Sequence, residues 1–261
     1  MKHISNQNID KVLKSGGRIF LFLDYDGTLT AIVKDPLAAH LNPTTKKLLR
    51  QLSKKKNLVL GIISGRSLAD IKKRVGVNNI LYAGNHGLEL LFKGKKTYTQ
   101  EALLKQCLST LNLAKRDLKR VFAGTKGVVF EDKGIIFAVH YRKVKKDLGG
   151  VRSTFKRIAA PYLKSGKLKI TTGKKVLEIR PNIPIDKFDA VNFFQKQLKK
   201  KANEITIFIG DDLTDEDVFR RLGKSDLGVR VGRKQNSFAK YFLKNPQEVE
   251  KLLISLLKSR I

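Results

Sequence analysis

Cysteine is almost absent from this sequence, and so are long apolar runs. The single cysteine, Cys107, cannot form an internal disulfide, and one thiol cannot build a thiolate zinc cluster. Leucines surround it in the sequence, so we expect it in the hydrophobic core. The longest apolar runs are Ile19–Leu23, Leu58–Ile63 and Ile205–Ile209, all far shorter than the roughly 20 residues of a membrane span. The polar start of the chain lacks the apolar core of a signal peptide, so we expect a cytoplasmic protein without a membrane segment.

Acidic residues are scarce relative to basic ones: 23 Asp and Glu stand against 54 Lys and Arg, for a net charge of +31. With 41% hydrophobic and 30% charged residues, the composition is typical of a globular chain and excludes disorder throughout. The sequence contains no zinc finger, no basic region with heptads and no aromatic-rich RNA-binding strand. We interpret the charge as a lysine-rich solvated surface. Two alternatives stay open: a positive cleft that attracts an anionic substrate, and a nucleic-acid-binding protein.

Buried strands and helices alternate in the first third of the 261 residues. Three continuous apolar segments are typical of parallel strands that are buried on both faces. These segments are Ile19–Asp24, Leu58–Ser64 and Ile80–Ala83. Asn42 followed by Pro43 predicts the start of a helix. Ser67 predicts the start of a second helix, which Gly76 ends.

The middle of the chain has the pattern of an antiparallel sheet covered by helices. Apolar residues at helical spacing predict helices over Glu101–Phe122 and Val151–Leu163. Two hairpins are predicted from pairs of apolar segments joined by short turns that contain glycine. The paired segments are Gly127–Phe130 with Ile135–Tyr141, and Leu168–Thr171 with Lys175–Ile179. Two helices and two hairpins together predict an α+β module.

The last third returns to alternating helices and strands. The predicted helices are Asp186–Lys200, Thr214–Leu222 and Gln247–Lys258, and the predicted strands are Ile205–Ile209 and Leu227–Val231. We therefore predict an α/β fold with a Rossmann-like parallel-sheet core, helices on both of its faces and an inserted, smaller α+β cap domain. The predicted core comprises residues 1–100 and 184–261, and the predicted cap comprises residues 101–183. Gly94–Thr99 marks the predicted exit from the core, and Pro181 and Pro184 mark the return.

The segment Asp24-Tyr25-Asp26-Gly27-Thr28-Leu29 directly follows a predicted buried strand. Ligand sites in open α/β sheets lie at the carboxyl ends of strands. Asp24 and Asp26 are two residues apart, so they share a face if strand geometry persists, and carboxylates that close repel each other unless a cation is present. Ligands that are all oxygen suggest Mg²⁺, which usually binds substrate phosphate as well.

Two further motifs end predicted strands. Ser64-Gly65-Arg66 combines a hydroxyl, a helix start and a guanidinium, which together can hold a phosphate, although Ser-Gly turns are also common without any ligand. Gly210–Asp217 contains five carboxylates in seven residues, which is costly unless they hold a cation or cap a helix. Asp211 is nearest the strand and is the predicted direct metal ligand. The last three acids of the segment can equally be first-turn residues that the helix dipole favours.

Together these motifs resemble the haloacid dehalogenase superfamily of phosphohydrolases. Its first motif is Asp-x-Asp-Gly-Thr, and its later motifs are a strand-end Ser or Thr, a Lys and an acidic Gly-Asp-Asp-type segment. More narrowly, the chain resembles trehalose-6-phosphate phosphatases over nearly its whole length. The segments that carry this likeness are Asp24–Leu29, Ile63–Arg66, Gly84–Glu89, Val139–Arg142, Leu177–Pro181 and Gly210–Asp217. Phe188 departs from the pattern, since the family usually has Gly after the motif Lys.

The resemblance implies catalytic roles for four residues. Asp24 would be the nucleophile that takes the phosphoryl group. Asp26 would protonate the leaving sugar oxygen and then activate water. Ser64 and Lys187 would hold the phosphoryl oxygens.

The resemblance also implies ligands for Mg²⁺ and for the sugar. Asp24, the backbone carbonyl of Asp26 and Asp211 would bind the ion, and Asp212 or Asp215 would support it through water or from just outside the ligand set. The cap positions that match the groups gripping the sugar hydroxyls are Glu131, Lys133, Lys174 and Glu178, and Arg66 and His86 would line the core side.

These roles imply Mg²⁺-dependent hydrolysis of trehalose 6-phosphate through an aspartyl-phosphate, in trehalose biosynthesis. The implied partners are a sugar phosphate and a trehalose-6-phosphate synthase, with no specific nucleic acid. The nearest alternative is a phosphatase for another sugar phosphate, such as sucrose phosphate or mannosylglycerate phosphate. A more distant alternative is a nucleic-acid-binding protein on an inactive phosphatase fold, against which the intact set of Asp24, Asp26 and Asp211 argues.

Overall fold

The computed structural model describes residues 1–4, 17–33, 38–145, 147–173 and 175–259. The chain forms two compact units, one made of Met1–Thr99 and Ile185–Ile261 and the other of Gln100–Pro184. We call the first the core unit and the second the cap unit. In the described ranges, every helix is too short or too polar to cross a membrane.

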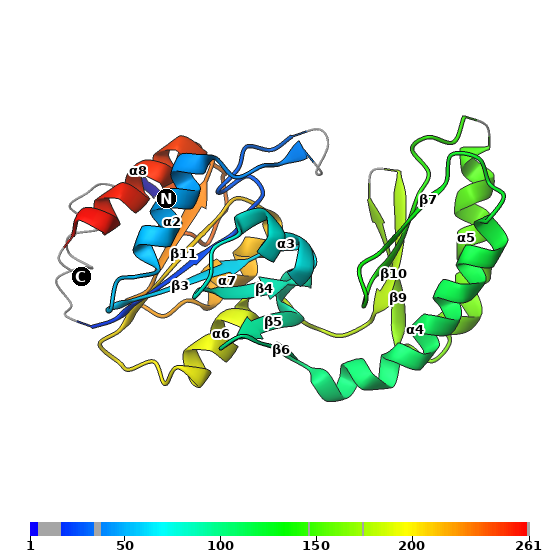
Figure 1. Cartoon of the computed structure of the whole chain (residues 1–261), viewed down its shortest axis with the longest axis horizontal. Coiled ribbons are helices and arrows are strands. Elements are labelled where there is room, and N and C mark those ends of the chain that lie inside the picture. Colours follow the sequence, from blue (N-terminus) through cyan, green and yellow to red (C-terminus); the bar gives the residue numbers. More distant parts are fainter. Residues whose placement is uncertain (5–16, 34–37, 146, 174, 260–261) are drawn as a thin grey trace. The chain divides into compact units, whose positions relative to one another are not determined.

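A nine-stranded sheet runs through the described part of the core unit, in the order β1-β13-β12-β11-β2-β3-β4-β5-β6 (Figure 1). Along this order, each strand from β1 as far as β4 pairs in parallel with the next one. Strand β5 pairs antiparallel with β4, and β6 pairs antiparallel with β5. The bounds are β1 (Lys2–His3), β2 (Ile19–Leu23), β3 (Leu58–Ile63), β4 (Leu81–Gly84), β5 (Glu89–Phe92), β6 (Lys95–Tyr98), β11 (Ile205–Gly210), β12 (Leu227–Val231) and β13 (Tyr241–Leu243).

Helices cover both faces of this sheet, which explains why β2 is apolar at every position. The helices are α2 (Pro43–Leu52), α3 (Leu68–Val75), α6 (Lys187–Gln197), α7 (Glu216–Arg221) and α8 (Pro246–Lys258), with short 3₁₀ turns at η2 (Asn85–Gly87) and η3 (Leu213–Asp215). Leu21 and Leu23 pack in one apolar cluster with residues of α2, α3 and α8. Phe20 and Phe22 pack in a second cluster with residues of α6 and α7. Alternate residues of one strand therefore fill two different cores.

The cap unit contains a four-stranded antiparallel sheet in the order β7-β8-β10-β9, among its described residues. The elements are α4 (Glu101–Phe122), β7 (Val129–Asp132), β8 (Phe137–His140), α5 (Leu148–Leu163), β9 (Leu168–Gly173) and β10 (Val176–Pro181). Helices α4 and α5 lie side by side and both contact β9 and β10 (Figure 1). On β10, the buried side chains of Leu177 and Ile179 alternate with the half-buried ones of Glu178 and Arg180. We call the face with Glu178 and Arg180 the polar face of the cap sheet.

Helix ends in the core unit follow the predicted signals. The side chain of Asn42 accepts a hydrogen bond from the backbone N–H of Thr44, and Pro43 is the first residue of α2. Ser67 caps α3, and Gly76 ends it in the left-handed conformation at φ 56°. The predictions of these two helix starts and of the glycine stop are confirmed.

Other predictions need correction. The chain leaves the core unit at Thr99, the last residue of the segment Gly94–Thr99 that was expected as the exit, but Lys95–Tyr98 first forms strand β6, paired with β5, which was not predicted. Strands of three or four residues give too little alternation to be detected in the sequence, and the same holds for β13. The helix expected over Asp186–Lys200 spans only α6, with Asp186 as its cap. Cys107 is buried, as predicted.

Phe194→Ala should destabilise the core unit strongly. Phe194 is fully buried on α6 and stacks on Phe22 with 6.0 Å between ring centroids. Removing a buried phenyl ring costs about 3–5 kcal/mol of unfolding free energy, because a cavity remains. Urea unfolding followed by circular dichroism measures this change. As a control, Phe238→Ala removes a ring that is 53% exposed and should cost less than about 1 kcal/mol; similar losses in both variants would contradict the packing account.

Candidate active site

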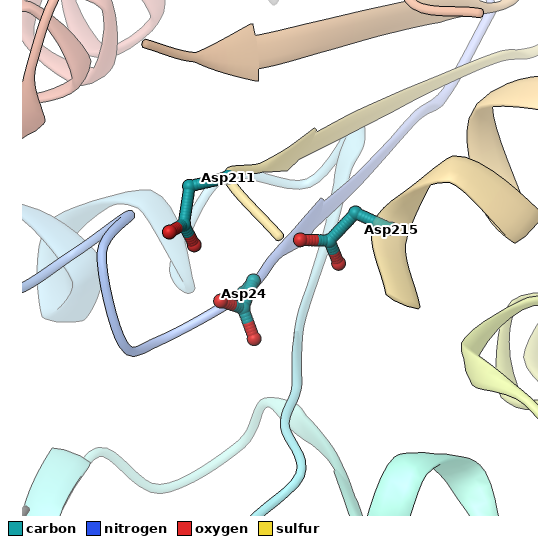
Figure 2. Close-up of side chains that lie close together, drawn as sticks. All are labelled: Asp24, Asp211 and Asp215. Atoms are coloured by element: carbon teal, nitrogen blue, oxygen red, sulfur yellow. The ribbon is translucent and has the colours of Figure 1, made fainter. Parts of the chain in front are cut away.

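Asp24 and Asp211 lie together because they follow neighbouring parallel strands. β2 pairs in parallel with β11, and Asp24 directly follows β2 while Asp211 directly follows β11. The backbone N–H of Asp24 continues the pairing, donating to the carbonyl of Ile209 at 2.9 Å. Asp215, at the end of η3, completes the group. One carboxylate oxygen from each of the three residues lies within 4.8 Å of the others, and Figure 2 shows the side chains converging.

The loop after Asp24 is shaped to admit the Asp211 carboxylate. Gly27 has a φ of +84°, a conformation that favours glycine, and a β-carbon at this position would collide with the carboxylate of Asp211. The Thr28 hydroxyl donates to the same carboxylate at 3.4 Å. The glycine and threonine of the first motif therefore make room for Asp211 and contact it.

The acidic segment after β11 folds on itself. The backbone N–H of Asp212 donates to the Asp215 carboxylate at 2.9 Å, and the exposed Asp212 carboxylate accepts from the N–H of Leu213 at 2.6 Å. Asp215 is fully buried beside Gly210, where a β-carbon would collide with it. Asp212 therefore caps its own turn, whereas Asp215 belongs to the carboxylate cluster.

Lys187 supplies the cation of this cluster. Its Nζ donates to Asp24 at 2.8 Å and to Asp215 at 2.7 Å, and the side chain is 3% exposed. Lys187 is the first residue of α6, and a capping box between Asp186 and Asp189 fixes the start of this helix. Lys187 therefore offsets part of the negative charge of Asp24 and Asp215, whereas its expected contact with phosphoryl oxygens stays a prediction.

Phe188, the departure from the family pattern, leaves Lys187 in place. Its backbone N–H donates to the Asp186 carboxylate at 2.8 Å, and its ring packs at the edge of the core under the guanidinium of Arg221, 4.5 Å from the ring centroid. A large side chain is accommodated here because it points into this packing.

Burial has the largest single effect on the pKa values of Asp24, Asp211 and Lys187. Burial raises the pKa of Asp24 well above its usual value, although the ammonium of Lys187 opposes the change. Burial, followed by the charge of Asp215, raises the pKa of Asp211 to about 6. Burial alone would lower the pKa of Lys187, but Asp24 and Asp215 outweigh it and raise that pKa. Lys187 therefore stays charged while three carboxylates share its single positive charge.

The donor chemistry of the cluster fits a hard divalent cation. Asp24, Asp211 and Asp215 offer oxygen ligands only, within 4.8 Å of one another. Burial first, and the neighbouring carboxylates after it, raise the pKa of both Asp24 and Asp211, although Lys187 opposes the change. A bound divalent cation would favour the charged forms of these carboxylates.

The guanidinium of Arg230 holds the backbone of the acidic segment, a role that sequence reasoning missed. It donates to the carbonyls of Asp211 and Asp212, the latter at 3.2 Å, and pairs with Glu216 at 2.7 Å. Glu216 also accepts from the N–H of Phe238 at 2.9 Å. The available signal was a charged residue inside the apolar strand Leu-Gly-Val-Arg-Val of β12. From the sequence, Glu216 could be either a cation ligand or an acid of the first helical turn. In the structure it lies in the first turn of α7 and pairs with Arg230.

Ser64, Arg66 and Asp26 form a second group at the same edge of the sheet. Ser64 follows β3, is 1% exposed, and its Oγ accepts from the backbone N–H of Arg66 at 3.1 Å. The Arg66 guanidinium donates to both carboxylate oxygens of Asp26, at 2.7 and 2.6 Å. The predicted phosphate-binding arginine thus pairs with the predicted acid–base residue.

His86 and Glu89 hold the next loop. The His86 N–H donates to the Ser64 carbonyl at 3.0 Å, and its ring lies where a β-carbon at Gly65 would be. The buried Glu89 accepts from the side chain of Asn85 at 2.6 Å and from the N–H of Leu68, at the start of α3, at 3.1 Å. Glu89 therefore ties the His86 loop to the helix that follows Arg66, a second role that sequence reasoning missed.

Three of the four predicted cap residues lie together near β10. Lys133 Nζ is 3.0 Å from the Glu178 carboxylate and 3.7 Å from that of Glu131. Glu178 also accepts from the Thr171 hydroxyl at 3.1 Å. Burial would raise the pKa of Glu178, but Lys133 outweighs it and holds that pKa below its usual value. The fourth, Lys174, lies outside the described residues.

Known proteins resemble the chain along most of its length. The family model for trehalose-phosphatase matches residues 22–247. A probable trehalose-phosphate phosphatase 4 of Oryza sativa subsp. japonica is 33% identical over 252 residues, which cover 93% of this chain and 67% of the relative. The trehalose-phosphate phosphatase of Mycobacterium bovis is 36% identical over 213 residues, covering 81% of this chain and 53% of the relative, so the chain spans about half of that protein.

Solved structures share the fold. A trehalose-6-phosphate phosphatase related protein superposes with a TM-score of 0.72 at 24% identity, over 91% of this chain and 97% of that one. The C-terminal domain of the Candida albicans trehalose-6-phosphate phosphatase has a TM-score of 0.72 at 23% identity, over 99% of both chains. With the family match over residues 22–247, the chain belongs to the trehalose-phosphatase family of phosphoric monoester hydrolases.

Proposed function

We propose that this chain hydrolyses trehalose 6-phosphate to trehalose and phosphate, with Mg²⁺ as cofactor and an aspartyl-phosphate as intermediate. The observation that carries the proposal is the cluster in which Asp24 and Asp215 contact the buried Lys187 and Asp211 adds a third carboxylate. The names of the similar rice and mycobacterial proteins support trehalose phosphate as the substrate.

In the proposed first step, an Asp24 oxygen attacks phosphorus and the bond to the sugar oxygen breaks. In the second step, water attacks the aspartyl-phosphate and releases phosphate, so one difficult displacement becomes two easier ones. Asp26 gives a proton to the leaving sugar oxygen and later takes one from water. Lys187, in contact with Asp24, and the N–H groups near Ser64 offset the negative charge of the phosphoryl group.

Asp24, Asp211 and the backbone carbonyl of Asp26 are the proposed ligands of Mg²⁺. The bound ion would supply positive charge against both the phosphate and its anionic nucleophile. Asp215 supports this set from inside the cluster, and Asp212 is the less suitable of the two predicted supporting acids because its carboxylate caps its own turn.

Sugar recognition is assigned to the cap unit. Glu131, Lys133 and Glu178 offer the donors and acceptors that sugar hydroxyls need, and Lys174 stays a prediction. Arg66 and His86 are the proposed contacts from the core unit. A cytoplasmic location and an association with a trehalose-6-phosphate synthase also stay predictions.

Phosphate release from a panel of sugar phosphates tests the substrate. Trehalose 6-phosphate should be turned over with the highest kcat/KM, and activity should vanish in EDTA and return when Mg²⁺ is added in excess. Sucrose phosphate and mannosylglycerate phosphate are the comparisons, since the core residues do not distinguish them. Equal or faster turnover of either one would move the assignment to that substrate.

Asp24→Asn should abolish turnover and leave the fold intact. An amide is not a nucleophile toward phosphorus, and loss of a catalytic nucleophile lowers kcat by roughly 10³-fold or more. Phosphate release measures the effect, and circular dichroism measures the fold. Asp217→Asn is a matched control in the acidic segment outside the cluster and should keep near-wild-type turnover. Wild-type rates in Asp24→Asn would show that the nucleophile is another residue.

Mg²⁺ should stabilise the folded chain more near pH 7.5 than near pH 5. The folded pKa of Asp211 is raised to about 6 and that of Asp24 is raised too, so the folded state holds protons that the unfolded chain releases near pH 4. In EDTA, these two carboxylates therefore contribute less stability as the pH rises from about 4 through 6. A bound cation competes with those protons, so its benefit grows over the same range.

Thermal unfolding in Mg²⁺ and in EDTA at the two pH values measures this difference. Asp211→Asn removes one proposed ligand and should shrink the Mg²⁺-induced rise in Tm. A rise of the same size at both pH values, or an unchanged rise in Asp211→Asn, would place the ion elsewhere.

A further inference from the structure

A carboxylate on α3 contacts the arginine that holds Asp26. Arg66 uses Nε and Nη2 for its two contacts with Asp26, and its Nη1 donates to Asp70 at 3.0 Å. The same guanidinium lies over the ring of Tyr25, 5.5 Å from the ring centroid. The Asp26 side chain is 44% exposed, whereas that of Arg66 is 11% exposed. The orientation of the Asp26 carboxylate therefore depends on where Arg66 is held.

Asp70 is itself fixed at the start of α3. Its backbone N–H donates to the hydroxyl of Ser67 at 3.3 Å. The Nε of Arg74 donates to both Asp70 carboxylate oxygens, at 2.9 and 2.8 Å, and the Nη1 of Arg74 donates to the Ala39 carbonyl at 2.7 Å. Burial would raise the pKa of Asp70, but Arg74 and then Arg66 outweigh it and hold that pKa below its usual value. Asp70 therefore stays charged and offers Arg66 a fixed acceptor.

Helix stability explains only part of this arrangement. An acid in the first turn of a helix is favourable, and the pair of Asp70 with Arg74, four residues later, is of a kind that contributes little to stability. Arg66 is different, because it directly precedes Ser67, the cap of α3, and a cation at a helix N-terminus is unfavourable. The place of Arg66 is explained by its two carboxylate partners, Asp26 and Asp70.

We propose that Asp70 is a positioning residue for the acid–base step, because it holds Arg66 and through Arg66 orients the carboxylate of Asp26. The inference rests on the proposed function, in which Asp26 gives a proton to the leaving sugar oxygen. That transfer needs the donor within hydrogen-bond reach of the leaving oxygen, so it is sensitive to a small change in orientation. All of these residues belong to the core unit, so the contacts that carry the inference do not involve the cap unit.

Asp70→Asn tests this role through the leaving group. The variant keeps the size of the side chain but replaces a carboxylate oxygen by an amide nitrogen that cannot accept from an arginine. The kcat/KM value covers the steps up to departure of the leaving group. For phenyl phosphate it should fall about fivefold or more, because phenolate is a strong base that leaves with the help of an acid. For p-nitrophenyl phosphate it should stay within about twofold, because p-nitrophenolate is a weak base that leaves unaided.

The sugar phosphate and two further variants extend the test. For trehalose 6-phosphate, whose leaving group is more basic still, kcat/KM in Asp70→Asn should fall about tenfold or more. Asp70→Ala, which removes the carboxylate outright, should show the same split between the two aryl phosphates. Asp70→Glu keeps the charge and should recover part of the loss on phenyl phosphate. A purely structural role of Asp70 would instead lower all three kcat/KM values together.

Glu248→Gln is the matched control, since Glu248 is the first-turn acid of α8 and its carboxylate lies 2.8 Å from the ring nitrogen of His3. It should leave all three kcat/KM values unchanged. An unchanged ratio of the phenyl and p-nitrophenyl values in Asp70→Asn, or the same change of that ratio in Glu248→Gln, would overturn the positioning role.

Failure of the proposed function is a separate result. The two aryl phosphates carry no sugar, so their comparison does not depend on which sugar phosphate is the substrate. Wild-type enzyme that hydrolyses both aryl phosphates but prefers sucrose phosphate to trehalose 6-phosphate would change the substrate and leave the test of Asp70 as it is.

Discussion

The buried contact of Lys187 with Asp24 and Asp215 is the interaction around which the core unit is arranged. Two ion pairs of 2.8 and 2.7 Å lie almost entirely out of water, and Asp211 adds a third carboxylate. Such a group is a poor source of stability, because desolvation of buried charges cancels much of their attraction. A parallel sheet with helices on both faces supplies that stability elsewhere, through β2 and the two apolar clusters beside it. The charged cluster lies at the carboxyl ends of the central strands β2 and β11.

Holding the carboxylates at one place requires control of the backbone, and buried polar groups provide it. Arg230 fixes the carbonyls of Asp211 and Asp212, and the glycines at 27 and 210 let carboxylates approach where a β-carbon would collide. Glu89 ties together the turns that follow β3 and β4. Arg230 and Glu89 each hold these segments through several hydrogen bonds, so the carboxylates stay together at a place where a cation can use their charge.

Sequence reasoning was most reliable where one residue type has one physical use. Continuous apolar runs predicted the central strands, the caps Asn42 and Ser67 predicted helix starts, and acids at strand ends predicted that Asp24 and Asp211 meet. Contacts between residues far apart in the chain could not be predicted in this way. Arg230 stands 19 positions from the carbonyl of Asp211 that it binds. Strand β6 was not predicted, because four residues carry too little alternation of apolar and polar side chains.

The pairing of Arg66 with Asp26 adds a constraint to the proposed chemistry. Both carboxylate oxygens of Asp26 accept from the guanidinium, while Arg66 also donates to Asp70 at 3.0 Å. Each carboxylate oxygen has two lone pairs, so one contact with Arg66 leaves a site on the same oxygen for a proton. In the proposed reaction, the Asp26 oxygen that exchanges a proton with the leaving sugar must face that sugar with this second site. The two contacts with Arg66 fix the orientation of the Asp26 carboxylate, so the proposed acid–base role depends on that orientation.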